Sequence, residues 1–131
     1  MISTKGRYAI RLMIDLAEQK LTAPVTLDAI ASRQDISKKY LESIVKLLVV
    51  GGLVKGVSGK GGGYLLTREP SEYTILEILQ LTEGSMATVA CLEKNAPECP
   101  RSHGCKTVDM WRNYDNMVKD YFNGITIQDL I

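Results

Sequence analysis

DISKKYLESIVKLLVVGGLVKGVSGKGGGYLL, residues 35–66, is the stretch of the chain that decides the fold. In its first part, apolar residues recur at the spacing of one helix face: Leu41, Ile44, Val45 and Leu48. The opposite side of this helix carries amine, hydroxyl and carboxylate groups, on Lys39, Glu42, Ser43 and Lys46. The helix should therefore pack on one side and present hydrogen-bonding groups and positive charge on the other, which suits a groove edged by phosphates.

A β-hairpin is expected after this helix, beyond the stop at Gly51-Gly52. β-Favouring residues at 53, 54 and 57 and at 64–66 flank a glycine-rich tip, residues 58–63, which contains Lys60. Such a tip is thin enough to lie against a nucleic-acid backbone. A polar helix followed by a basic-tipped hairpin is typical of the recognition helix and the wing of a winged helix-turn-helix.

The residues before this stretch supply the rest of a helix-turn-helix. Thr26 should cap a short helix over residues 27–34, and a tight turn at 34–36 leads to Ser37, the cap of the recognition helix. An earlier helix, over about residues 4–18, is apolar over so much of its girth that it should be buried on two sides. A plain pair of helices without a nucleic-acid role is the alternative, and the adjacent wing favours DNA binding.

Charge is distributed unevenly along the chain, although the net charge is only +1. Residues 1–70 carry eleven Lys and Arg against six Asp and Glu, whereas residues 71–131 carry five against nine. A basic front half and an acidic rear half fit a chain whose front meets a polyanion. No apolar run reaches the roughly 18 residues that cross a bilayer, and the start lacks a secretory segment, so a cytoplasmic protein is expected.

Enzyme chemistry finds no support in the motifs. The single histidine, His103, has no evident nucleophile or orienting partner in the sequence. GKGGG at residues 59–63 is not a phosphate-binding P-loop, because the lysine precedes the glycines and no Gly-Lys-Ser/Thr follows. We therefore expect a binding protein and not an enzyme.

Three cysteines, Cys91, Cys99 and Cys105, lie within fifteen residues and none occurs elsewhere. They fall in an expected loop over residues 85–104, and their odd number without an export signal argues for metal or redox chemistry. Thiolates suit an iron–sulfur cluster or zinc, and zinc is the weaker choice because the loop lacks closely paired cysteines. Direct oxidation of a low-pKa thiolate is a third possibility.

A last long helix is expected from Lys106 to about Phe122. One face of it collects Trp111, Tyr114, Val118, Tyr121 and Phe122. Because so small a domain cannot bury this face alone, we expect a symmetric homodimer that reads a pseudo-palindromic operator; folding back on its own domain is the alternative. The expected architecture is mainly α with a small β-hairpin wing: a winged helix-turn-helix domain at 1–84, a cysteine-bearing sensor loop at 85–105, and a dimerisation helix and tail at 106–131.

Four segments together resemble the Rrf2 family of bacterial transcriptional regulators. They are ISTKGRYAIRLMIDLA at 2–17, SKKYLESIVKLL at 37–48, GKGGGYLL at 59–66 and the three-cysteine loop. The resemblance implies a dimeric winged-helix protein whose long C-terminal helix crosses its partner. Several members carry an iron–sulfur cluster on three cysteines, and a cysteine-metabolism repressor branch shares the fold without a cluster.

By this resemblance, Cys91, Cys99 and Cys105 match the family's three thiolate ligands, and a 2Fe–2S cluster is expected ahead of a 4Fe–4S cluster. The family's fourth ligand does not carry over, because the positions that supply it in two branches hold Val108 and Tyr8 here. The nearby substitutes are Glu98, His103 and Asp109. An exchangeable fourth ligand would suit a sensor, because it would leave one iron open to oxidants, nitric oxide or a small thiol.

The expected DNA contacts come from the start of the recognition helix and from the wing tip: Ser37, Lys38, Lys39, Tyr40, Glu42, Ser43, Lys60, Gly61 and Gly62. Glu42 can accept from a cytosine amine, whereas Tyr40 suits packing as well as DNA contact. The chain is thus expected to be a dimeric DNA-binding transcriptional regulator, of the repressor type, whose DNA affinity is tuned by an iron–sulfur cluster. The alternative is a cluster-free repressor of cysteine or sulfur metabolism, gated by a thiol switch or a partner enzyme.

Overall fold

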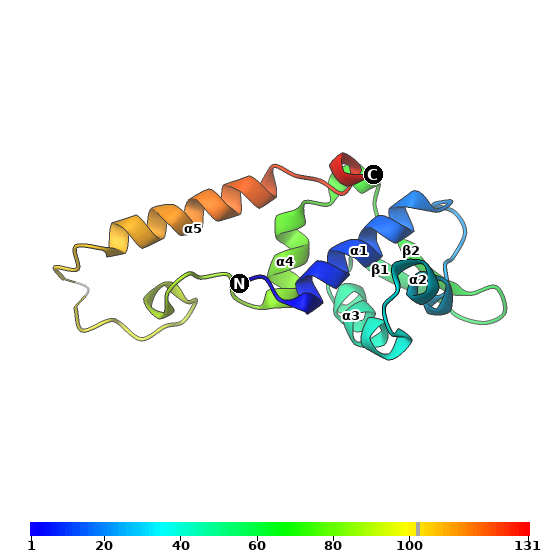
Figure 1. Cartoon of the computed structure of the whole chain (residues 1–131), viewed down its shortest axis with the longest axis horizontal. Coiled ribbons are helices and arrows are strands. Elements are labelled where there is room, and N and C mark those ends of the chain that lie inside the picture. Colours follow the sequence, from blue (N-terminus) through cyan, green and yellow to red (C-terminus); the bar gives the residue numbers. More distant parts are fainter. Residues whose placement is uncertain (102) are drawn as a thin grey trace.

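The computed structural model describes residues 1–101 and 103–131 of the chain. In chain order the main elements are α1 Thr4–Glu18, α2 Leu27–Gln34, α3 Lys38–Val50, β1 Val54–Val57, β2 Gly63–Leu66, α4 Ile75–Glu83 and α5 Val108–Asn123. Short 3-10 turns lie at Pro70–Glu72, Ala90–Leu92 and Gln128–Leu130. Figure 1 shows a body made of α1–α4 and the hairpin, from which α5 and the loop before it extend as an arm.

Hydroxyl caps begin four of the helices, among them those that the sequence predicts at Thr26 and Ser37. The side chains of Ser3, Thr26, Ser37 and Thr74 each accept a hydrogen bond from the backbone N–H three residues later. At the other end of α2, Asp35 adopts a left-handed conformation with φ 54°, which turns the chain into α3. The starts of α2 and α3 and the turn between them are therefore set by local residues: Thr26, Asp35 and Ser37.

The hydrophobic core lies between α1 and the elements around it, namely α2, α3, α4 and β2. The predicted inner face of α3 (Leu41, Ile44, Val45 and Leu48) is at most 2% exposed. On α1, Ala9, Leu12 and Met13 are completely buried, so this helix occupies the middle of the body. None of the helices in the described part of the chain is long and apolar enough to cross a membrane.

The wing is an antiparallel hairpin in which Val54 pairs with Leu66 and Val57 with Gly63. Val25, just before α2, joins it through two backbone hydrogen bonds with Tyr64, at 3.0 and 2.8 Å. Gly63 makes this contact possible, because its φ is 153° and a Cβ there would lie 2.5 Å from the carbonyl oxygen of Val25. The hairpin is therefore joined directly to the helix-turn-helix.

The arm differs in two details from the sequence expectation. α5 begins at Val108, two residues later than predicted, and the cysteine loop (residues 85–105) contains the 3-10 turn Ala90–Leu92. After α5 the chain returns to the body, where Ile125 accepts from the N–H of Ile75 at 2.9 Å. Ile127 is fully buried there, so the C-terminal end of α5 is anchored in the core.

Candidate nucleic-acid interface and cysteine loop

The outer side of α3 presents the polar residues that the sequence predicts. Ser37, Lys38, Lys39, Glu42 and Ser43 are exposed. Ser43 also donates a hydrogen bond from its hydroxyl to the carbonyl oxygen of Tyr40 at 2.7 Å, within the helix. Since the apolar side of α3 is buried, these side chains face outward, as they must to meet a DNA groove.

A groove of about 430 Å³ separates α3 from the wing. Its polar lining comes from α2, α3 and β2: Thr26, Asp28, Lys38, Glu42, Lys46 and Tyr64. Sequence reasoning did not select Thr26, Asp28 and Tyr64 as interface residues. Their common position depends on the bridge between Val25 and Tyr64, which joins segments far apart in the chain.

Lys38 forms an exposed ion pair with Asp28 across this groove, with 3.1 Å between Nζ and the carboxylate. An ion pair in water contributes at most about 1 kcal/mol, so the lysine can exchange Asp28 for a phosphate at little cost. Asp28 is thus an acidic neighbour that moderates the positive charge of the recognition helix.

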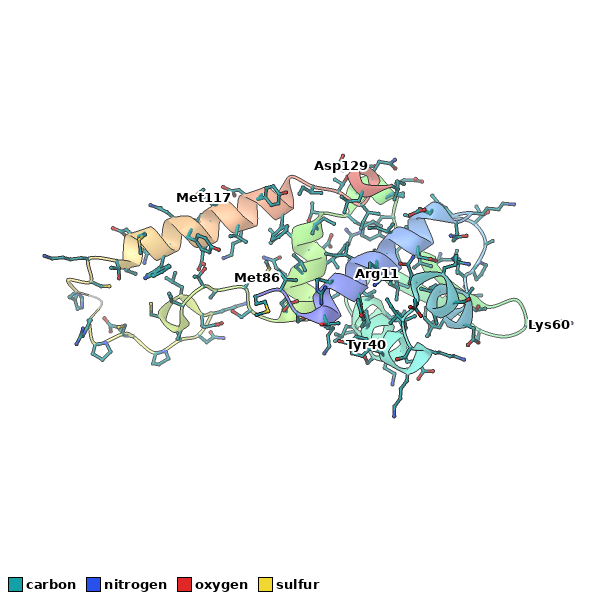
Figure 2. The ribbon with its side chains drawn as sticks, in the orientation of Figure 1. Arg11, Tyr40, Lys60, Met86, Met117 and Asp129 are labelled. Carbon is teal, nitrogen blue, oxygen red and sulfur yellow. The ribbon has the colours of Figure 1, made fainter. Side chains whose placement is uncertain are left out.

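Tyr40 is half-buried, and its ring packs edge-on against the ring of Tyr8 with 5.7 Å between centroids. The guanidinium of Arg11 lies 5.2 Å from the Tyr8 ring centroid, and its Nε donates to the side-chain oxygen of Gln34 at 3.2 Å. Figure 2 shows Arg11 on α1 and Tyr40 on α3. The contacts of the Tyr40 ring therefore favour its packing role.

Lys60 stands at the far end of the wing, directed away from the body (Figure 2). The turn beneath it is closed by a hydrogen bond from the N–H of Gly62 to the carbonyl oxygen of Gly59 at 3.0 Å. Lys60 and Gly61 are exposed and Gly62 is half-buried. A narrow tip with a single lysine can reach a phosphate or the minor groove without steric hindrance.

The three cysteines are free thiols; Cys91 is exposed, and Cys99 and Cys105 are half-buried. Within residues 1–101 and 103–131, no three His, Cys, Asp or Glu side chains lie close enough together to hold one metal ion. The structure therefore does not bring the predicted ligands together. Three thiols nonetheless suit an iron–sulfur cluster chemically, and a loop outside the core can rearrange to gather them.

The substitute fourth ligands are engaged elsewhere. His103 Nε2 lies 3.3 Å from the carboxylate of Glu98, and Asp109 pairs with Arg112 at 2.9 Å; all four side chains are exposed. These surface pairs are weak and can exchange for a metal.

The thiol of Cys105 has a distinct electrostatic environment. Its pKa is lowered chiefly by a hydrogen bond with the hydroxyl of Thr107, at 3.4 Å, and further by the backbone N–H groups of Thr107 and Val108 and the charge of Arg101. Hydrogen bonds and positive charge favour the thiolate, which is both the metal ligand and the nucleophile.

A helix-turn-helix with an exposed basic helix, a glycine-tipped wing and a long additional helix defines a winged-helix DNA-binding regulator. Residues 2–131 match the Rrf2 family, described as an iron-dependent transcriptional regulator. The chain belongs to the Rrf2 family of transcriptional regulators.

Known relatives span nearly the whole chain. The HTH-type transcriptional regulator IscR of Klebsiella pneumoniae (strain 342) is 35% identical over 99% of this chain and 78% of its own length. CymR, the global cysteine regulator of B. subtilis, superposes with a TM-score of 0.83 at 34% identity, covering 99% of this chain and 95% of that one. IscR of T. potens superposes with a TM-score of 0.76 at 32% identity, over 99% and 85%. These relatives are regulators and not enzymes, as the sequence predicts.

Proposed function

We propose that this protein is a homodimeric cytoplasmic regulator that binds a pseudo-palindromic operator through α3 and the wing. In this proposal Cys91, Cys99 and Cys105 hold an iron–sulfur cluster, preferably 2Fe–2S, that tunes DNA affinity. The observation that carries it is the combination, in one chain, of an exposed basic helix and wing with a three-thiol loop that leads into α5. The family description as iron-dependent supports the metal.

An apolar stripe on α5 supports the dimer. Met110, Tyr114, Met117 and Tyr121 are between 52% and 71% exposed. They follow one another at intervals of four, three and four residues, which is the spacing of a coiled-coil seam. Figure 2 shows Met117 on the side of α5 that faces away from the cysteine loop. A second copy of the same stripe is the occupant whose shape and chemistry match it in a two-fold dimer.

A buried carboxylate connects the cysteine loop to this helix. Asp115 on α5 is 6% exposed and accepts hydrogen bonds from the backbone N–H and the hydroxyl of Thr88. The N–H contact measures 3.0 Å, and Thr88 lies only three residues before Cys91. Ordering of the loop would therefore reposition α5, and with it the distance between the two α3 helices of a dimer.

When bound, the cluster would supply iron that reacts with oxidants or nitric oxide. The first test is anaerobic purification followed by an absorption spectrum and iron and sulfide assays. Operator affinity is then compared for loaded and cluster-free protein, with an operator selected from random duplex DNA. Brown protein and different affinities are expected, whereas equal affinities would contradict the sensor proposal. The control replaces all three cysteines by serine.

A cluster-free thiol switch is the second candidate. The separated thiols and the lowered pKa of Cys105 favour it, and so does the similarity to CymR. Colourless protein whose operator affinity changes on mild oxidation, and returns on reduction, would support this candidate. If the protein is colourless and its operator affinity does not respond to oxidants, gating by a partner enzyme is the remaining explanation. Co-purification of the regulator with that enzyme would detect the complex.

The contribution of the wing can be measured separately from the sensor. Lys60→Ala should weaken binding roughly tenfold per half-site for every DNA sequence, because a phosphate contact is lost. The slope of log affinity against log salt concentration should fall in magnitude by about one per half-site. An unchanged slope would contradict the contact of the wing with DNA.

A further inference from the structure

The hydroxyl of Tyr73 joins the two ends of the wing inside the protein. Tyr73 is fully buried, and its hydroxyl donates to the carbonyl oxygen of Leu53 at 2.8 Å. The hydroxyl oxygen of Tyr73 also accepts hydrogen bonds from the backbone N–H groups of Thr67 at 2.8 Å and Arg68 at 2.9 Å. Leu53 directly precedes β1 and Thr67 directly follows β2, so one side chain ties both strands where they leave the body.

Arg68 and Thr67 add further contacts at this junction. The guanidinium of Arg68 lies 4.9 Å from the Tyr73 ring centroid and donates two hydrogen bonds, at 2.9 and 2.8 Å, to the carboxylate of Glu77 on α4. The hydroxyl of Thr67 donates to the carbonyl oxygen of Gly52 at 2.8 Å. We call Tyr73, Thr67, Arg68 and Glu77 the wing clamp.

The outer half of the wing lacks comparable support. A Cβ added at Gly59 or Gly61 would meet none of the described residues within 4 Å, and Figure 1 shows the tip projecting from the body. A two-stranded hairpin is marginally stable by itself, so its direction is set by its base together with the bridge between Val25 and Tyr64. Lys60 is about 20 Å along the strand from Leu53, and a tilt of about 10° at the base would move it by roughly 3 Å.

We propose that Tyr73 is a positioning residue for DNA binding: its hydroxyl fixes the angle of the wing and so brings Lys60 to the DNA backbone. Tyr73 is too deeply buried to touch DNA, and it acts only through the hairpin. This inference rests on the proposed contact between the wing and DNA. Tyr73 would thus control DNA affinity although it lies outside the DNA interface.

Tyr73→Phe tests this role, because it keeps the buried ring and removes only the hydroxyl. Affinity for the selected operator is measured at several salt concentrations for the wild-type protein, Tyr73→Phe, Lys60→Ala and the double variant. We expect Tyr73→Phe to weaken binding roughly three- to tenfold and to lower the salt slope towards that of Lys60→Ala. The double variant should bind no more weakly than Lys60→Ala alone, because both changes remove one contact.

A matched control separates positioning from stability. Ile78→Val, in the core of α4, should lower the Tm and leave the salt slope unchanged. If Tyr73→Phe does not fold, Thr67→Val provides the same comparison by breaking the bond to Gly52. An unchanged salt slope for a folded clamp variant, or effects that multiply with Lys60→Ala, would overturn the inference. An unchanged slope for Lys60→Ala itself would refute the wing contact, which is a failure of the proposed function.

Discussion

Glu42 is an acidic residue on the basic outer side of α3, and it lines the groove between α3 and the wing. A carboxylate is repelled by the phosphates of DNA and gains no binding energy from them. In a DNA interface it can instead accept hydrogen bonds from base amines. Its position could be predicted from helical periodicity alone. The neighbouring Asp28 could not, because its place in the groove depends on how α2 meets the wing.

Glu42→Ala should relax base preference more than it weakens binding. Loss of one base contact removes about 1–3 kcal/mol of discrimination at one position of each half-site, while loss of a negative charge favours phosphate contact. Selection from random duplex DNA would measure this as a weaker base preference at that position of the selected operators. Glu72→Gln removes an equal charge away from α3 and should select the wild-type operator; unchanged preference in Glu42→Ala would contradict the assignment.

The lowered pKa of Cys105 predicts pH-dependent reactivity in the reduced, cluster-free protein. In a variant that retains only this cysteine, alkylation by iodoacetamide should rise with a midpoint below the roughly 8.5 of an ordinary thiol. The pKa of Cys105 is lower in the folded protein than in the unfolded chain. The thiolate of Cys105 therefore stabilises the folded protein fully at a pH above the unfolded-state pKa. This stabilisation is lost as pH falls through the folded pKa.

Thr107→Val is the matched variant for this measurement. It keeps the shape of the side chain and removes the hydroxyl that chiefly lowers the pKa of Cys105. The alkylation midpoint should therefore move upward. A midpoint that stays the same would show that the backbone N–H groups and Arg101 are sufficient.

Among the elements, those with a hydroxyl cap could be predicted closely. The start of α3 at Lys38 follows from Ser37, because a serine hydroxyl satisfies the N–H group three residues on. α5 has no such cap: Thr107 makes no side-chain capping bond, and the helix begins at Val108 instead of Lys106. The turn around Cys91 likewise had no sequence pattern that would reveal it.

The junction of α1 and α2 depends on a buried charge that sequence periodicity did not reveal. Asp15 is 2% exposed and accepts hydrogen bonds from Arg33, at 3.0 and 2.7 Å, and from Gln34, at 3.0 Å. The hydrogen bonds between Arg33 and Asp15 chiefly raise the pKa of Arg33. Partners 18 and 19 residues away cannot be recognised from the sequence around Asp15.

Arg33→Ala should lower the free energy of unfolding by about 2 kcal/mol, because it leaves the buried carboxylate of Asp15 with Gln34 as its remaining partner. The value is below that for a fully buried pair because the Arg33 side chain is 40% exposed. Denaturant titration would measure it. Arg7→Ala, an exposed arginine on α1, should change stability by less than about 0.5 kcal/mol; equal effects would contradict the role of this ion pair.

At the scale of the whole molecule, the exposed apolar surface of α5 agrees only in part with the face that the sequence predicts. Tyr114 and Tyr121 belong to the exposed stripe as expected, whereas Phe122 packs towards the core. Met110 and Met117 complete the stripe, and they lie outside the aromatic face that the sequence predicts. The face of a helix that remains open is decided by tertiary packing.

Met117→Glu should shift the protein from dimer to monomer, because it places a charge in the centre of the stripe. Sedimentation velocity would detect the change, and circular dichroism should show a folded chain. Affinity for a two-half-site operator should fall at least roughly tenfold, while affinity for a single half-site stays similar. Asn116→Glu adds the same charge outside the stripe and should remain dimeric; a dimeric Met117→Glu protein would refute this interface.

The two ends of α5 are held unequally, and this has a mechanical consequence. Its C-terminal end is fixed by buried Ile127, whose N–H donates to the carbonyl oxygen of Tyr73 at 3.0 Å, whereas its other end, about 24 Å away, joins the cysteine loop. The helix is thus anchored in the core at its C-terminal end, which we call the pivot, and the thiols lie near its other end. Tyr73 touches the pivot with its backbone and the wing with its side chain. A displacement of α5 would therefore reach the DNA-facing hairpin through Tyr73, which belongs to the hydrophobic core.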